Sequence, residues 1–163
     1  MKKNLKKMLV CLVMMTLIPI RVFAAEAVDE PEIIEMTEEE AEYYLELYRS
    51  ETGVMPCSDF SDTELGIFQS DGKLMVVYST SCSKLASEIG TKQILLEVKD
   101  GLFWSALAAK TKEYTTNDYI HTGGFYYTKP VSGSNYRVSG VHFAVVDGKE
   151  ITRYASTGSF TYN

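Results

Sequence analysis

The most regular pattern in the chain is an alternation of apolar and polar residues from Asn135 to Tyr162, broken once by Asp147-Gly148. Asp-Gly suits the two central positions of a type I′ turn because both positions need positive φ, so the flanking runs are expected to pair as an antiparallel hairpin. An isolated hairpin is only marginally stable in water. The rest of the chain must therefore complete this sheet and supply a second one to pack on it.

Two further Asp-Gly pairs, at Asp71-Gly72 and Asp100-Gly101, separate β-rich runs in the same way. Pro130 marks the end of another run as an edge or a bulge, because proline cannot donate to a strand ladder. Before the last hairpin, strands are predicted at 65–68, 74–80, 93–99, 102–109 and 125–131. Seven short strands without an intervening helix favour a mainly β fold, a seven-stranded antiparallel sandwich. A small closed barrel is the alternative.

The alternation also predicts a core in which the inner faces of two strands meet across the sandwich. The predicted inner residues are Leu74, Val76 and Tyr78 on one strand and Ile94, Leu96 and Val98 on the other. On the penultimate strand, Tyr136 and Val138 fit one register, whereas the next apolar residues fall in the opposite one. We therefore expect a β-bulge at Ser139-Gly140. Without a bulge, His142 faces the core as a buried, hydrogen-bonded histidine and not as a ligand.

The pattern before the strands is helical. Thr37 and Glu40 have the spacing of a capping box, acidic residues crowd the first turn, and Gly53 stands where a C-terminal cap is expected. The sequence predicts an amphipathic helix whose apolar stripe packs on its own domain. That stripe consists of Ala41, Tyr44, Leu45 and Tyr48. The predicted organisation is an acidic flexible leader at 25–36, the helix at 37–52, a loop at 53–64 and the sandwich at 65–163.

The N-terminus has the features of a secretory signal peptide. Four lysines precede an apolar run of about a dozen residues, and small residues follow at Ala24-Ala25. We expect residues 1–24 to be removed by cleavage after Ala24, with cleavage after Ala25 or Ala27 as alternatives. A retained membrane anchor is disfavoured because the run is short and contains Pro19. The sequence therefore predicts a secreted protein without a membrane partner after cleavage.

Charge is divided unevenly along the chain. Without residues 1–24 the sequence has 11 basic and 22 acidic residues, which argues against a nucleic-acid partner. Residues 26–64 hold 14 of the acids and a single base, Arg49, whereas the β-region is nearly neutral. One hypothesis is that the acidic segment docks on the more basic sandwich by charge attraction, which salt would weaken.

Cys57 and Cys82 are the only cysteines after the predicted signal peptide. In an exported chain an even pair favours a disulfide, which would stabilise the fold by roughly 3 kcal/mol through the loop that it closes. A reactive thiol partnered by His121 or His142 is the alternative. The residues around the two cysteines do not resemble a nucleophile site.

Short motifs in the β-region carry a resemblance to known folds. The stretch from Gly133 to Val138, with its Tyr136-Arg137-Val138, resembles the penultimate strand of fibronectin type III and immunoglobulin-like domains, where a tyrosine hydrogen-bonds back to the chain. The order of the following motifs is similar to that in an uncharacterised family of small secreted β-proteins from Gram-positive bacteria. These are Glu88-Ile89-Gly90, the run 94–98, Asp100-Gly101 followed by Trp104, and Tyr136-Arg137-Val138. This resemblance covers about Leu65 to Tyr162. It implies an immunoglobulin-like sandwich and transfers no activity and no catalytic residues.

The sequence offers little for catalysis. His121 and His142 have no zinc-ligand spacing, and no nucleophile elbow, phosphate loop or paired catalytic carboxylates are recognised. We therefore predict a non-enzymatic protein without a cofactor or a metal site.

Binding is the favoured class of function. The chain has 11 tyrosines, and exposed aromatic side chains often carry contacts with glycans or proteins. Because neighbours on a strand face opposite sides, Tyr126 and Tyr154 are the candidate ligand-binding residues. The predicted partner is a protein or a cell-envelope glycan, so a carbohydrate-binding module is the main alternative to an interaction module. A secreted toxin or bacteriocin-like protein is a third alternative.

Overall fold

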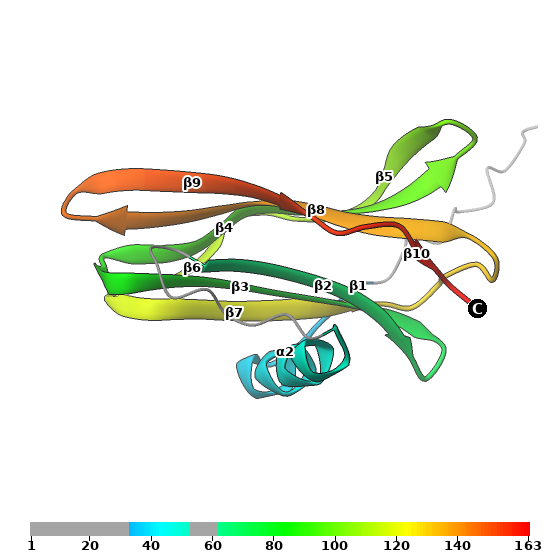
Figure 1. Cartoon of the computed structure of the whole chain (residues 1–163), viewed down its shortest axis with the longest axis horizontal. Coiled ribbons are helices and arrows are strands. Elements are labelled where there is room, and N and C mark those ends of the chain that lie inside the picture. Colours follow the sequence, from blue (N-terminus) through cyan, green and yellow to red (C-terminus); the bar gives the residue numbers. More distant parts are fainter. Residues whose placement is uncertain (1–32, 53–61) are drawn as a thin grey trace, which may run out of the picture. The chain divides into compact units, whose positions relative to one another are not determined.

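Two antiparallel sheets pack face to face, and one helix lies against the outer face of the smaller sheet (Figure 1). The computed structural model describes residues 33–52 and 62–163. The elements are β1 (Ile33–Glu35), α2 (Glu38–Thr52), β2 (Asp62–Ser70), β3 (Lys73–Ala86), β4 (Glu88–Asp100), β5 (Phe103–Lys110), β6 (Glu113–Thr115), β7 (Asp118–Tyr127), β8 (Asn135–Val146), β9 (Lys149–Ser156) and β10 (Phe160–Thr161). Across these ranges, no helix has the length and apolar character needed to cross a membrane.

The smaller sheet has the strand order β1-β7-β3-β2, and the larger one has the order β10-β8-β4-β5, with β9 also on β8 and β6 also on β4. The predicted mainly β, two-sheet sandwich is confirmed. The described residues form ten strands and not seven. The three unpredicted strands, β1, β6 and β10, have three residues or fewer. Elements this short do not show an alternating pattern, so the sequence gives no signal for them.

Two of the three Asp-Gly turns form as predicted. Asp71 and Asp147 have φ values of 50° and 52°, and the glycine after each also has positive φ. The prediction for Asp100-Gly101 is wrong by one residue, because Asp100 pairs with Phe103 and the turn is Gly101-Leu102. Positive φ is confined to Gly101 there, as in a type II′ turn. Leu102 consequently lies at the tip of the hairpin and is 91% exposed.

The predicted core is confirmed. The inner faces of β3 and β4 meet in the larger of two apolar clusters, which also contains Phe125 of β7 and Tyr136 and Val138 of β8. Tyr136 also fulfils the expected hydrogen bond back to the chain, since the Val131 backbone N–H donates to its hydroxyl at 2.8 Å. The penultimate long strand is therefore anchored at its start both by packing and by this bond.

The β-bulge predicted at Ser139-Gly140 is wrong. β8 pairs continuously with β9, and the irregularity lies on β4, where Lys92 is the extra residue between Thr91 and Gln93. His142 therefore faces the core and is 1% exposed, as expected for an unbroken strand. The apolar residues of β8 change register in the sequence because this strand buries side chains on both of its faces. Phe143 is covered on the outer face by Tyr114 and Lys112.

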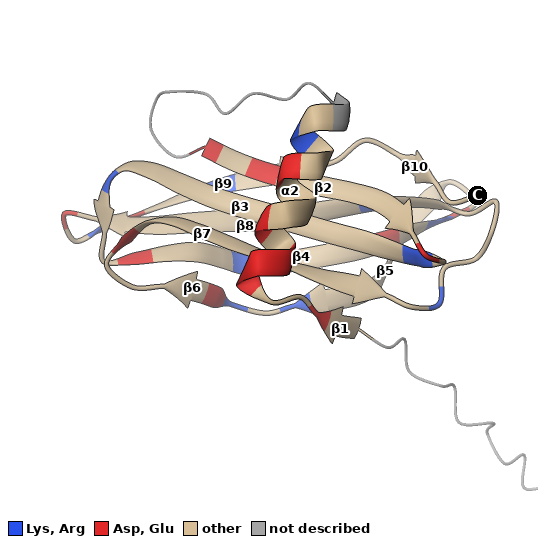
Figure 2. Ribbon diagram, turned by 90° about the horizontal axis from the view of Figure 1, so that it is seen from below, with Lys and Arg blue, Asp and Glu red and all other residues tan. Residues whose placement is uncertain are grey.

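The capping box that starts α2 is present. The Thr37 N–H donates to Glu40 Oε2 at 2.8 Å, and the Glu40 N–H donates to Thr37 Oγ1 at 3.2 Å. The apolar stripe faces the smaller sheet, with Ala41 and Leu45 buried. Figure 2 shows the helix lying across the strands of that sheet, and its glutamates at positions 38–40, 42 and 46 are exposed. Apolar packing therefore seats the helix.

Charge makes a smaller contribution than the docking hypothesis proposed. Arg49 of α2 forms an ion pair with Glu64, which belongs to the same acidic segment as the helix. One contact does join the two regions, since Lys110 of β5 lies 2.6 Å from Glu35 of β1. Ile33–Glu35, interpreted from sequence as part of a flexible leader, pairs with β7 as a strand.

Replacing Leu45 by alanine is expected to lower the free energy of unfolding by about 2–4 kcal/mol, because a buried contact of α2 with the sheet is lost. Leu47 on the same helix is 37% exposed, so Leu47→Ala is the matched control and should cost less than about 1 kcal/mol. Chemical denaturation at low and high salt measures both. Equal effects of the two variants, or a salt effect as large as Leu45→Ala, would contradict docking by apolar packing.

Candidate functional site

A polar layer divides the interior of the sandwich into two apolar clusters. Along the inner face of β3, Tyr78 belongs to the larger cluster and Cys82 to the smaller one, with Thr80 between them. Strand pairing places His121 of β7 beside Thr80, and Thr91 of β4 beside His142 of β8. The two pairs come from different sheets and meet where Thr80 Oγ1 lies 2.7 Å from His142 Nδ1.

Hydrogen-bond geometry fixes the tautomer of His142. The single hydroxyl proton of Thr80 is donated to the Gly90 carbonyl at 3.0 Å, so Thr80 accepts from the Nδ1–H of His142. His142 Nε2 is then an acceptor, and it is buried without a partner among the described residues, as is Thr91 Oγ1. Burial lowers the pKa of His142 to about 4, with smaller contributions from His121 and Arg153. His142 is therefore neutral at physiological pH.

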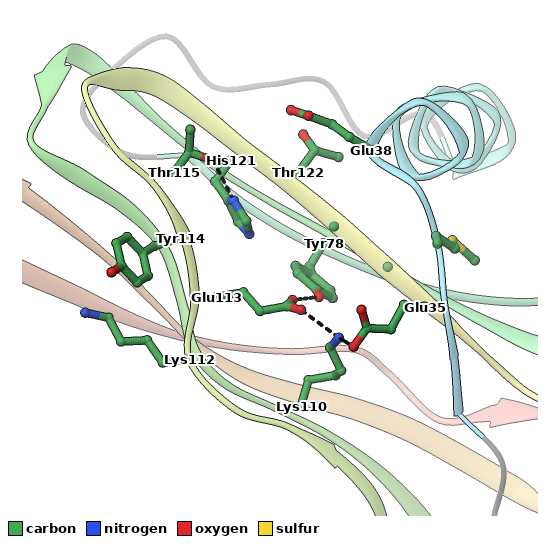
Figure 3. A pocket seen from close by; sticks show the side chains of 13 residues that line it. Glu35, Glu38, Tyr78, Lys110, Lys112, Glu113, Tyr114, Thr115, His121 and Thr122 are labelled. Carbon is green, nitrogen blue, oxygen red and sulfur yellow. Dashed lines mark hydrogen bonds and ion pairs between the residues drawn. The ribbon is translucent and has the colours of Figure 1, made fainter.

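A pocket of about 410 Å³ opens between the sheets next to this layer. Its lining comes from Tyr78 of β3, from β6 and residues 121–124 of β7, from Lys110 and Lys112 before β6, and from the segment that joins β1 to α2. Figure 3 shows Lys110 meeting two carboxylates, with His121 on the same side of β7 as Tyr78 and with Glu38 and Thr122 on the other side of that strand. The size is within the range of small-ligand sites.

Four side chains from four elements form a connected polar chain at the base of the pocket. Tyr78 donates its hydroxyl to Glu113 Oε2, and Lys110 lies 2.6 Å from Glu113 Oε1 and 2.6 Å from Glu35 Oε1. Burial, followed by the bond to Glu113, raises the pKa of Tyr78 far above its usual range. The hydrogen bond from Lys110 lowers the pKa of Glu35. Tyr78 is thus a fixed donor, and Lys110 is a charge held between two carboxylates.

His121 forms the opposite wall of the pocket. Its Nδ1 lies 3.0 Å from Thr115 Oγ1, its ring centroid is 6.4 Å from that of Tyr78, and its Nε2 is buried without a partner among the described residues. Burial lowers the pKa of His121, although the charges of Glu113 and Glu38 oppose that shift. The wall of the pocket therefore includes an imidazole whose Nε2 is buried and unpaired among the described residues.

Two glycines are required by close approaches around this site. A methyl group at Gly123 would lie 2.6 Å from the Tyr78 ring, so glycine is needed for Tyr78 to pack under β7. A methyl group at Gly90 would lie 2.1 Å from the Glu113 carbonyl oxygen, so glycine allows β6 to pair with β4. The position of Glu113 in the pocket depends on that pairing.

The outer face of the six-stranded sheet carries a second polar and aromatic arrangement. Arg137 stacks over Trp104 at 4.5 Å and forms two hydrogen bonds of 2.9 Å with Glu97. Ser139 donates to the same carboxylate at 3.0 Å. The hydrogen bonds with Glu97 raise the pKa of Arg137, and the nearby phenol of Tyr154 adds to that shift. Trp104 of β5, Arg137 of β8 and Tyr154 of β9 are named the aromatic face below.

The structure separates the two tyrosines that the sequence suggested as ligand contacts. Tyr154 is 65% exposed on the aromatic face. Tyr126 lies on the outer face of the smaller sheet, where Tyr44 of α2 packs against it at 6.1 Å and Lys73 lies over its ring. The two residues do not form one patch, and Trp104 on the aromatic face is partly buried.

Cys82 is a free, buried thiol, and burial raises its pKa. The predicted disulfide is therefore absent from the part of the chain that the structure describes, and Cys57 lies outside it. Among the described residues, no group of three or more His, Cys, Asp or Glu side chains is arranged to hold a metal ion.

Sequence reasoning missed Tyr78, Lys110 and Glu113 as pocket residues. The available signal was Lys110, a charged residue at the end of an apolar strand, followed by Glu113 at a distance that allows an ion pair. The contribution of Glu35 carried no such signal, because it depends on the three-residue strand β1.

The fold and these two arrangements define the chain as a two-sheet β-sandwich protein. No protein-family model matches the sequence, and no protein with a curated description matches it. A solved structure titled "Crystal structure of protein from Archaeoglobus fulgidus" is similar, with a TM-score of 0.33 and 8% identity over 67% of this chain and 98% of that chain. A likeness at this level carries no argument about function.

Acidification should destabilise the protein through His142. Its folded pKa is about 4 against an ordinary value of 6.5, so as the pH falls the unfolded chain takes up this proton first. Between about pH 7 and pH 5, where most carboxylates stay ionised, the free energy of unfolding should fall by about 2 kcal/mol through this residue. Denaturation at both pH values measures it, and His142→Asn should reduce the difference. An unchanged difference in the variant would contradict the assignment.

Tyr78→Phe should lower the free energy of unfolding by roughly 1.5–3 kcal/mol, because Glu113 loses a buried hydrogen bond to its charged carboxylate. Tyr154→Phe, which removes the hydroxyl of an exposed tyrosine, is the control and should be nearly neutral. Urea denaturation measures the free energy of unfolding of both variants. Similar effects of the two substitutions would show that the Tyr78–Glu113 bond does not stabilise the fold.

Proposed function

We propose that this protein is a secreted, non-enzymatic binding module that acts at or near the cell envelope through its aromatic face. The observation that carries the proposal is the difference between the two outer faces. The smaller sheet is covered by α2, whereas no described element covers the aromatic face of the larger sheet (Figure 1). A sheet face that is uncovered and partly aromatic is typical of recognition surfaces.

The contacts of the aromatic face support this role. Arg137 is held by two hydrogen bonds to Glu97 and by stacking on Trp104, so little side-chain entropy remains to be lost on binding. Trp, Tyr and Arg are also the residues that most often carry binding energy in interfaces. Tyr154 adds a second exposed ring on the neighbouring side of Arg137.

A glycan is the second candidate for the ligand. Two aromatic rings on one sheet face can stack on sugar rings, while Arg137 offers N–H donors for hydroxyl groups. Tyr126 does not offer this arrangement, because Tyr44 of α2 packs against its ring. A carbohydrate-binding module is therefore the alternative to a protein-interaction module.

The finer identity of the fold belongs to the same proposal. The hydrogen bond from the Val131 N–H to the Tyr136 hydroxyl supports an immunoglobulin-like or fibronectin-like sandwich. The signal-peptide pattern and the motifs at Glu88-Ile89-Gly90 and Asp100-Gly101 support a secreted member of the uncharacterised Gram-positive proteins that the sequence resembles.

The test is co-sedimentation of the purified protein with insoluble peptidoglycan and a panel of insoluble polysaccharides. Retention is expected, and Trp104→Ala or Tyr154→Ala should weaken it roughly tenfold, because each removes an aromatic contact. Tyr43→Ala is the matched control, since Tyr43 is 63% exposed on α2 at the opposite side of the molecule. Absence of retention on every polysaccharide would remove the glycan candidate. Retention that neither variant weakens would place the contact elsewhere.

A further inference from the structure

β5 forms an open edge of the larger sheet. It pairs with β4 along one side, and no other described strand pairs with it. Natural sheets keep their edges apart with short edge strands or with exposed charges. β6 and β10 have three residues or fewer, and β9 at the opposite edge carries three exposed charged residues, Lys149, Glu150 and Arg153. β5 has eight residues, and its charged residue, Lys110, is paired within the chain at the end of the strand.

The sequence of this edge is free of charge from Gly101 to Ala109. Charged residues make up 23% of the whole chain, which has a formal net charge of −6. Two copies of the protein therefore repel one another in general, but they can approach along β5 without bringing like charges together. Ser105 and Ala106 in the middle of the run are exposed, so the edge is accessible.

Phe103 gives a second sign that β5 meets another molecule. Ser105 pairs with Val98, which packs against the larger apolar cluster, and Phe103 lies two residues from Ser105 on the same face of the strand. Phe103 thus belongs to the core side of the sheet, yet it is 76% exposed. Figure 1 shows the tip of the β4–β5 hairpin turning away from the rest of the two sheets. A large apolar ring left uncovered in this way is typical of an interface.

We propose that β5 pairs antiparallel with β5 of a second copy of this chain, so that two larger sheets join edge to edge. Ser105 is the middle residue of the uncharged run, and pairing about it gives a twofold arrangement in which both copies use the same strand. Phe103 of each copy then lies near Leu107 of the other, and main-chain hydrogen bonds supply affinity. Because β9 carries exposed charges, the opposite edge does not pair, and the assembly ends at two copies.

The dimer should be weak and reversible. An edge of eight residues is small beside the roughly 20–30 residues that each partner contributes to a standard interface. Sedimentation velocity of the purified protein between about 10 μM and 1 mM, the range of weak association, should show the mean mass rising toward that of two chains. Hydrogen exchange should slow at β5 amides as the concentration rises, and it should not slow at β9.

Ser105→Lys should weaken the dimer roughly tenfold, because the two added ammonium groups meet at the twofold axis. Thr152→Lys is the matched control, since it adds the same charge at an exposed residue of β9, on the opposite edge. Phe103→Ala should also weaken the dimer several-fold without removing a core contact, as its ring is mostly exposed. A protein that is monomeric throughout, association that Ser105→Lys leaves unchanged, or equal weakening by Thr152→Lys would each overturn the proposal.

A lipid surface is the other occupant that the exposed side chains of Leu102 and Phe103 would suit. Flotation with phosphatidylglycerol vesicles tests it. A protein that stays monomeric and floats with the vesicles would overturn the strand pairing and assign the hairpin tip to lipid. The pairing does not depend on what the aromatic face binds, so a monomer that is retained on polysaccharides would contradict the pairing alone.

Discussion

The hydrogen bond between Thr80 and His142 is the interaction on which the interior of this sandwich depends, because it joins the two sheets where apolar packing is interrupted. Buried polar groups cost stability when they are unpaired, so the Thr80 hydroxyl must serve both the Gly90 carbonyl and the His142 ring. A slip of one residue in β3 or β8 would turn one partner outward and leave the other unpaired. The polar layer therefore specifies the register of the strands more strictly than the apolar clusters do.

The same constraint explains why a pocket lies next to this layer. β4 is bordered first by β5 and then by β6, and the chain passes from one to the other between Lys110 and Glu113. Both side chains turn inward, toward Tyr78, where their charges would be costly without partners. Glu35 completes the arrangement from the N-terminal segment. The buried charge of Lys110 is thus balanced in part by Glu35, a residue so far away in the sequence that no local pattern predicts the pair.

Much of the scaffold could be predicted from sequence because its signals are local. The turns at Asp71 and Asp147, the capping box at Thr37 and the alternation along β3 each depend on a few neighbouring residues. The misplaced turn at Gly101 and the bulge at Lys92 depend on how a partner strand pairs, which no local pattern encodes. The pocket was missed for the same reason, since its residues come from β1, β3, β5, β6 and β7 and meet only in the folded sheets.

The two outer faces of the sandwich differ because the helix can cover only one of them. α2 buries its apolar stripe on the smaller sheet, and Gly66 there leaves room for the Tyr48 ring, 3.0 Å from where a methyl group would lie. On the larger sheet, Phe143 is shielded by Tyr114 and the ammonium group of Lys112 and needs no helix over it. Large side chains on that face thus protect one another while Trp104 and Tyr154 keep part of their rings accessible. Because the apolar side chains of this face cover one another, no other element has to cover the sheet. The face is therefore available for recognition without any rearrangement of the fold.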